Sequence, residues 1–203
     1  MRLESVIAKQ AYNFLSLHDV AAMVERVRCF DKTLTDELHI GLSPMLKVLQ
    51  NLLKEEVSIR DFTTIVEVIA ESGEQDVDQL TQLVREALSR KIMRHCFGQS
   101  RVAHVITLDP KVEQMIKASM TFSSQERLRP QTVEKIAAEL LSLSEEVLKN
   151  GDFPVIVTER SARLRLRRLI EKRLPDLPVL SFSEMSSDLT VQSAGMLKSD
   201  VLI

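Results

Sequence analysis

The sequence is poor in the residues that build tight turns, disulfides and aromatic cores. Its 203 residues include 5 Gly, 6 Pro, 2 Cys and no Trp, and aromatic residues make up only 4% of the chain. So few glycines and prolines argue against a sandwich or a barrel with many tight turns. The core must instead be built mainly from Leu, Ile, Val and Met. At this length the chain can bury one good core or two small ones.

The two cysteines, Cys29 and Cys96, lie far apart in the sequence and form no spaced pair. The sequence therefore predicts neither a disulfide framework nor a zinc box, and it suits a reducing compartment. No apolar run approaches the roughly 20 residues that cross a bilayer. The mixed residues after Met1 do not indicate a signal peptide. The formal net charge of −2 does not favour a polyanion-binding protein.

Patterns of catalytic or metal-binding residues are also missing. None of the four histidines has a second His or Cys at metal-ligand spacing, apart from the adjacent pair His95 and Cys96. Neighbours on a helix point about 100° apart and do not chelate one ion together. The sequence has no glycine-rich phosphate loop and no nucleophile elbow. We therefore expect neither an enzyme nor a bound cofactor or metal.

What is present is helical periodicity, which runs through residues 1–98. Apolar residues recur there at spacings of three and four, between signals for helix starts and stops. The first half is therefore expected to be an all-helical subdomain. The expected helices cover residues 3–14, 17–29, part of 31–41 with Gly41 as the stop, the segment after Ser43, 58 to about 73, and 76 or 78 to about 97.

Two of the helix starts carry strong signals. Ser16 lies three residues before Asp19, the spacing of a capping box. Ser43 precedes Pro44, and Ser is a good N-cap, whereas Pro suits the first helical position because its missing N–H would be unpaired there. We therefore expect Ser16 and Ser43 to cap the helices that follow them.

A third start, in LLKEEVSIRDFTTIVEVIAE (52–71), is less simple. The Ser58 hydroxyl can accept from the Asp61 N–H while the Asp61 carboxylate accepts from the Ser58 N–H, which predicts another capping box. A carboxylate in the first turn also complements the helix dipole, but a cation there is mildly unfavourable. Arg60 therefore requires a partner elsewhere.

The character of the chain changes after residue 100, where short apolar runs typical of strands alternate with helical segments. PVIVT (154–158) is almost continuously apolar, as expected of a strand covered on both faces. The sequence predicts an α+β protein whose second part is a small α/β domain with helices packed on a sheet. The expected strands cover residues 102–107, 154–158, 178–182 and 189–195, and the expected helices cover 109–120, 130–149 and 160–173.

The last of these helices, RSARLRLRRLIEKR (160–173), holds seven basic residues. Its predicted buried stripe consists of Ala162, Leu166, Leu169 and Ile170, with the arginines on either side. A nucleic-acid groove is one interpretation. A solvated face or a protein-contact surface is favoured, because the rest of the domain cancels the charge and no interleaved aromatics offer stacking platforms.

Several motifs resemble one family in collinear order. VLQNLLKEEVSIRDFTTIVEVIAE (48–71) is similar to the cytosolic half of the large export-gate protein of type III secretion systems, the flagellar FlhA and injectisome SctV type. The resemblance continues through the segments LVREALSRKI (83–92), VITLDPKVEQ (105–114), FPVIVTERSARLRLRRLIEKRLPDLPVLSFSEM (153–185) and GML.

The resemblance implies a domain plan. Residues 1–15 would be the closing helix of a missing upstream subdomain, and 16–98 the helical subdomain implicated in ring contacts. Residues 99–203 would be the last, small α/β subdomain, of ferredoxin-like or ring-building type. Pro154–Thr158 and Val179–Phe182 would be strands of that last subdomain. The membrane-spanning half would be absent, with Met1 as an artificial start.

The implied function is a non-enzymatic, ring-forming platform, nonameric in the whole protein, on the cytoplasmic face of the bacterial inner membrane. The implied partners are other copies, other export-apparatus proteins, the ATPase-complex stalk, chaperone–substrate complexes and a gatekeeper. Nucleic acid is not among them, and the membrane is reached only through the missing half. The alternative is a helix–turn–helix DNA-binding regulator, with residues 44–71 as helix pairs and 160–173 as a basic contact helix.

A closed ring joins two different patches of one protomer, so Arg60 is a candidate for pairing with a carboxylate on a neighbouring copy. An internal salt bridge with Glu56 or Glu67 is the alternative. The candidate protein-interface residues are Arg60, Asp61, Glu67, Arg163 and Arg167.

Overall fold

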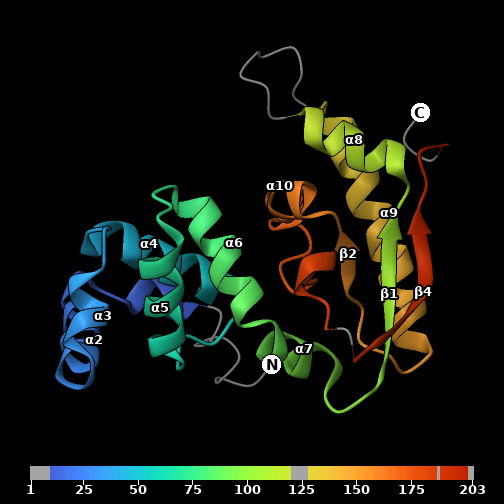
Figure 1. Ribbon diagram of the computed structural model, residues 1–203. Helices are drawn as coiled ribbons and strands as arrows, with labels where there is room; N and C mark the ends of the chain where they lie inside the picture. The colour runs from blue at the N-terminus through green and yellow to red at the C-terminus, as the bar shows by residue number, and fades with distance from the viewer. Residues whose placement is uncertain (1–9, 120–127, 187, 201–203) are drawn as a thin grey trace. The chain divides into compact units, whose positions relative to one another are not determined.

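The computed structural model describes residues 10–119, 128–186 and 188–200 (Figure 1). The chain forms two compact units, one ending at Ile92 and the other beginning at Met93. The sequence placed this boundary a few residues later, between residues 98 and 99. Most of the expected helix over 3–14 lies outside the described residues, although its last part, residues 10–14, is helical.

The first unit is built from helices. Its central helix, α6, packs against both α4 and α5, while α2 packs against α3 and α4. The core residues of this unit come mainly from the apolar faces of α2, α4, α5 and α6, as amphipathic periodicity requires. The helices are α2 (Leu17–Phe30), α3 (Lys32–Asp36), α4 (Leu42–Lys54), α5 (Phe62–Ser72), α6 (Val77–Ala87) and α7 (Ser89–Phe97), which runs across the division between the units.

The start of α2 confirms the predicted capping box. The Ser16 hydroxyl accepts from the Asp19 N–H at 3.2 Å, and the Asp19 carboxylate accepts from the Ser16 N–H at 2.9 Å. The stop of α5 at Gly73 is confirmed too. Gly73 adopts a φ of 63°, in the left-handed region that favours glycine at helix C-termini.

Two predicted helix starts are wrong. The α4 helix begins at Leu42 with Gly41 as its N-cap, so Ser43 lies inside the first turn and Pro44 is its third helical residue. Pro is tolerated there because the N–H groups of the first turn have no acceptor within the helix, so the N–H that proline lacks is not needed. The α5 helix begins at Phe62 with Asp61 as its N-cap.

The predicted Ser58–Asp61 capping box is therefore not formed. The Ser58 hydroxyl accepts from the Arg60 N–H at 3.4 Å, and the Asp61 carboxylate forms an ion pair with Lys91 of α7. A charged partner distant in the sequence thus replaces the local hydrogen bond that the spacing suggested. The helix expected from Asp76 to Phe97 does start with Asp76 as N-cap, but it is divided into α6 and α7 at the buried Leu88.

The second unit contains a four-stranded sheet in the order β3-β2-β1-β4, with every neighbouring pair parallel. The long arrows of β1 and β4 run side by side in Figure 1. The α+β class is confirmed. The elements are β1 (Val102–Leu108), α8 (Pro110–Ala118), α9 (Pro130–Lys149), β2 (Ile156–Thr158), α10 (Arg160–Ile170), β3 (Val179–Ser181), the 3₁₀ helix η1 (Phe182–Glu184) and β4 (Thr190–Leu197).

The all-parallel order corrects the ferredoxin-like alternative, because a ferredoxin-like sheet contains antiparallel pairs. Helices connect β1 to β2 and β2 to β3. Such a crossover brings the chain back to the end of the sheet where the previous strand began, so the next strand runs parallel to it. The ring-building alternative stays a prediction.

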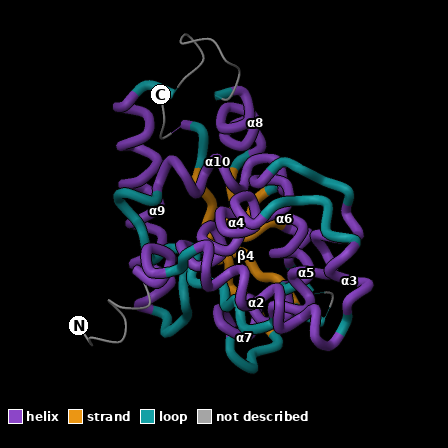
Figure 2. The backbone as a smooth tube through the Cα atoms, turned by 90° about the vertical axis from the view of Figure 1, so that its left-hand side faces the viewer, coloured by secondary structure: helices purple, strands orange, loops and turns teal. Residues whose placement is uncertain are grey.

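The helices α8, α9 and α10 share one core with the sheet. Ile106, Ile156 and Val179 are register partners on adjacent strands, so their side chains point to the same face. They belong to one buried cluster with Ile116 of α8 and Leu140 of α9, and α10 contributes Leu166. In Figure 2 the strands of this sheet are the orange segments.

An ion pair buried in the first unit ties α6 to the end of α4. The Arg85 side chain is 2% exposed, and its Nη1 lies 3.2 Å from a carboxylate oxygen of Glu55, which is 11% exposed. Sequence periodicity did not identify this pair, because Glu55 and Arg85 are distant in the sequence. Removal of one member of such a pair leaves a buried charge without compensation.

We expect Arg85→Met to lower the free energy of unfolding by about 3–5 kcal/mol, because the Glu55 carboxylate loses its ion pair with Arg85. Urea unfolding followed by circular dichroism measures the loss. The control is Lys91→Met at the exposed pair of Lys91 and Asp61, whose side chains are 53% and 32% exposed; it should cost about 0–1 kcal/mol. Equal losses in the two variants would contradict the prediction.

Candidate protein-binding surfaces

Arg60 lies exposed in the segment between α4 and α5. Within the described residues its guanidinium has no hydrogen bond or ion pair, so the internal pairing with Glu56 or Glu67 is not formed. Glu67 is likewise exposed, on α5. A cation free of local partners at a helix start is available to a carboxylate on another molecule.

Asp61, by contrast, is already engaged. Its hydrogen bond with Lys91 lowers the pKa of the Asp61 carboxyl, a shift that burial opposes and that Thr64 and the charge of Lys91 reinforce. A carboxyl with a depressed pKa stabilises the fold above its ordinary pKa, and that stabilisation is lost as the pH falls through the lower, folded-state value. Asp61 therefore acts within the first unit and leaves the neighbouring Arg60 uncompensated.

The structure places Arg163 and Arg167 inside the second unit, where they are 0% and 8% exposed. The prediction that they flank the apolar stripe at the surface is wrong. Arg163 Nη1 donates to the Val179 carbonyl at 3.4 Å, on the sheet side of α10. Main-chain carbonyls enclosed beside α10 need donors, and a guanidinium supplies several from one side chain.

Arg167 fixes the segment that follows α10, residues 173–177. Its guanidinium donates to three carbonyls, those of Leu174 at 3.3 Å, Pro175 at 2.8 Å and Leu177 at 3.2 Å. The basic run therefore does not form one continuous basic face, because two of its seven cations point inward. This arrangement gives no support to a DNA-contact helix.

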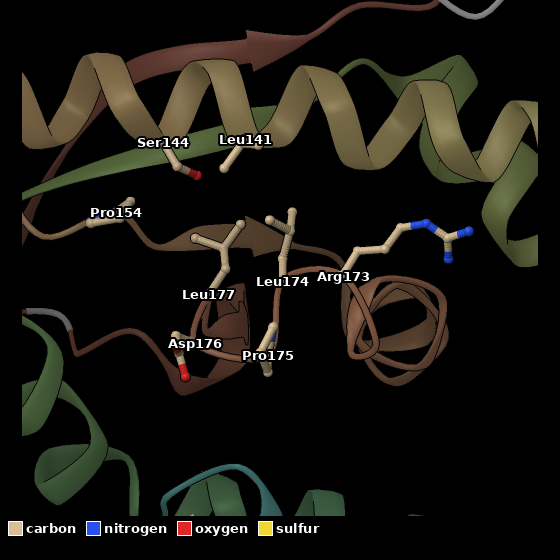
Figure 3. A pocket seen from close by; sticks show the side chains of 8 residues that line it. All are labelled: Leu141, Ser144, Pro154, Arg173, Leu174, Pro175, Asp176 and Leu177. Atoms are coloured by element: carbon tan, nitrogen blue, oxygen red, sulfur yellow. The ribbon is translucent and has the colours of Figure 1, made fainter. Parts of the chain in front are cut away.

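A pocket of about 240 Å³ lies between α9 and residues 173–177 (Figure 3). Leu174 and Leu177 point from this segment toward α9, whereas Asp176 points away. Arg173 at its edge is paired with Glu134 of α9. Pockets that hold drug-sized ligands or cofactors have volumes of roughly 300–1,000 Å³. This smaller, mainly apolar pocket suits an inserted side chain. The lining residues are Leu141, Ser144, Pro154, Arg173, Leu174, Pro175, Asp176 and Leu177.

Exposed apolar residues occur beside the pocket. Leu141 is 46% exposed, Leu148 on the same helix 56%, and Phe153, next to the lining residue Pro154, 46%. The spacing of seven residues places Leu141 and Leu148 on one side of α9. Such a surface marks a site of protein interaction more often than an isolated exposed leucine does. The spacing of the two leucines could have indicated this exposed apolar surface from the sequence. The sequence does not show that residues 173–177 lie opposite α9 and form the other wall of the pocket.

Two buried carboxylates in the second unit accept hydrogen bonds from the protein itself. Glu113 of α8 accepts from the Thr158 hydroxyl at 2.6 Å and from the Glu159 N–H at 3.1 Å, at the start of α10. Glu184 accepts from the N–H and hydroxyl of Ser181 at 2.6 and 2.9 Å.

Across the described residues, no group of three His, Cys, Asp or Glu side chains could hold a metal ion. Over the same residues, no helix is both long and apolar enough to span a bilayer.

We expect Arg167→Met to loosen residues 173–177, because three carbonyls lose a charged donor and each such bond contributes about 1.5–3 kcal/mol. The readout is hydrogen exchange at the Leu177 amide, which donates to the Leu174 carbonyl. Its protection should fall by at least tenfold. Lys172→Met, at an exposed cation of the same run, is the control and should leave that amide unchanged. Full protection in Arg167→Met would exclude the anchoring role.

The chain is similar to known proteins over most of its length. The model of the FHIPEP family matches residues 1–190. Over 160 residues the chain is 36% identical to the flagellar biosynthesis protein FlhA of Proteus mirabilis, covering 78% of this chain and 23% of that protein. The chain thus spans about a quarter of the length of such curated relatives.

Solved structures show the same fold. The cryo-EM structure of nonameric EPEC SctV-C matches with a TM-score of 0.84 at 26% identity, over 96% of this chain and 61% of that chain. The structure of the Chlamydia pneumoniae CdsV and CdsO protein complex matches with a TM-score of 0.80 at 27% identity, over 96% and 59%.

Proposed function

The chain belongs to the FHIPEP family, the export-gate family of flagellar FlhA and injectisome SctV proteins, and on that premise we propose that it forms part of the cytosolic ring platform of a type III protein export apparatus. The observation that carries the proposal is the match to nonameric EPEC SctV-C over 96% of the chain. Because the chain spans only part of its relatives, the platform is a property proposed for the whole protein.

The first unit is the proposed ring-contact region. A cyclic ring is built from heterologous contacts, in which one patch of a protomer meets a different patch of the next. Arg60 suits such a contact because it is exposed and has no internal partner among the described residues. The neighbouring copy would supply the carboxylate. Glu67, an exposed acidic residue of the same unit, is a candidate for that carboxylate.

The second unit is the proposed partner-binding region. Its apolar pocket between α9 and residues 173–177 has a wall fixed by Arg167, so little ordering entropy is lost when a partner's side chain enters. The proposed partners are proteins of the export apparatus, including the ATPase-complex stalk, chaperone–substrate complexes and a gatekeeper. The complex of CdsV with CdsO is a precedent in a relative.

The proposed role needs no catalytic centre. Glu113 and Glu184, the buried carboxylates of the second unit, accept hydrogen bonds from the protein itself. We place the platform on the cytoplasmic face of the inner membrane, with the membrane contact in a part of the relatives that this chain does not cover.

A deletion of the gene in its native host tests the proposal. Loss of type III export, flagellar or injectisome, with restoration by the full-length gene, is the expected result. Unchanged export of every substrate would overturn the proposal. Tight binding of duplex DNA at physiological salt by the purified chain would instead support a DNA-binding regulator.

We expect Arg60→Glu to leave the melting temperature of the isolated chain nearly unchanged, because exposed residues without partners contribute within about 0.5 kcal/mol. Export by the full-length protein carrying the same change should fall sharply, since each interface of the ring loses an attraction and gains a repulsion. Lys111→Glu, at an exposed cation of the second unit, is the matched control and should export normally. Normal export by Arg60→Glu would remove Arg60 from the ring contact.

A further inference from the structure

Both ring nitrogens of His104 have partners on different elements. Nδ1 lies 2.8 Å from a carboxylate oxygen of Asp152, in the connection between α9 and β2. Nε2 lies 3.0 Å from Oε1 of Gln192, its register partner on β4. His104 itself is on β1, so one side chain links a strand, its edge neighbour and a turn.

The edge strand that His104 holds has two unlike halves. A register irregularity between Val105 and Ile106 of β1 divides β4. Beyond it, Leu197 is fully buried, and a Cβ on Gly195 would lie 2.9 Å from the Leu143 side chain, so this half is packed tightly against α9. Before it, residues 190–193 are all exposed.

This exposed half has few attachments apart from its ladder with β1. The Thr190 N–H donates to the Arg101 carbonyl, and Gln192 meets His104. No charged residue occurs between Asp188 and Lys198, so β4 lacks the charges that usually discourage edge strands from pairing with other chains.

We propose that His104 is a proton-dependent clasp, which fastens the exposed half of β4 to β1 and to the α9–β2 connection when the imidazole is charged. A protonated imidazole donates from both nitrogens, which matches the two oxygens that face it. A neutral imidazole has one donor and one acceptor, so it must give up one bond or require the Gln192 amide to turn over.

The charges around His104 fix the direction of the effect. Asp152 is the charged group that acts on His104. The strand β4 contains no charged residue, and none occurs between Asp152 and Glu159, the stretch that includes β2. The hydrogen bond to Asp152, followed by that to Gln192, raises the pKa of His104 against a smaller effect of burial. The stabilisation is thus complete below the ordinary histidine pKa of about 6.5 and disappears as the pH rises through the higher folded-state pKa.

NMR of the isolated chain tests the clasp. The His104 ring signals should titrate with a midpoint above about 6.5. Hydrogen exchange at the amides of residues 191–193, corrected for intrinsic rates, should accelerate about two- to fivefold across that midpoint, the scale of a partly exposed ion pair. In His104→Gln the corrected rates should not change with pH over this range.

Two variants move the midpoint in opposite directions. Asp152→Asn should lower it, and Gln192→Glu should raise it by adding a second carboxylate at Nε2. Asp188→Asn, which removes an exposed carboxylate near the start of β4, is the matched control and should leave it unchanged. An unmoved midpoint in Asp152→Asn, or retained pH dependence of exchange in His104→Gln, would overturn the proposal.

Discussion

The segment that follows α10 is held in place by hydrogen bonds from Arg167 to its main-chain carbonyls. That segment turns back toward the sheet without regular structure, and the Leu174, Pro175 and Leu177 carbonyls point toward the helix. Arg167 supplies donors to all three from the helix side. The bond to Leu177 is buried and the other two are part-buried. Because a carbonyl removed from water without a donor is costly, these bonds favour one position of the segment, and with it one wall of the pocket.

The same requirement explains why the basic run does not form one continuous basic face. The apolar stripe of α10 follows the helical period, but the helix is enclosed more widely than its apolar residues alone would cover, and Arg163 and Arg167 lie in the added arc. Each replaces hydration by carbonyl oxygens. Arginine suits such places because its guanidinium is weakly hydrated and has five donors. The run is therefore partly a structural device and partly solvated surface, and charge counting alone could not separate the two.

Local chemistry made much of the fold predictable. Ser16 and Asp19 lie three residues apart and form the expected capping box, and the long helix from Pro130 to Lys149 has the predicted bounds. Failures arise where a distant partner decides. Asp61 turns to Lys91, thirty residues away in sequence, and Ser58 consequently caps nothing beyond its own turn. The strand directions escaped prediction for the same reason, since short strands do not reveal which neighbour they pair with.

The engagement of Asp61 bears on the proposed ring contact of Arg60. If Asp61 had formed the local capping box, its carboxylate would have remained beside Arg60 and reduced the positive potential there. Because Lys91 takes up that carboxylate, the Arg60 guanidinium stays exposed and uncompensated at the start of α5. An isolated charge pair at a surface contributes little, but a closed ring repeats each contact at every interface and makes all of them in one assembly. A residue that hardly affects the stability of one copy can therefore decide whether the proposed ring forms, which is why we propose the first unit as the ring-contact region.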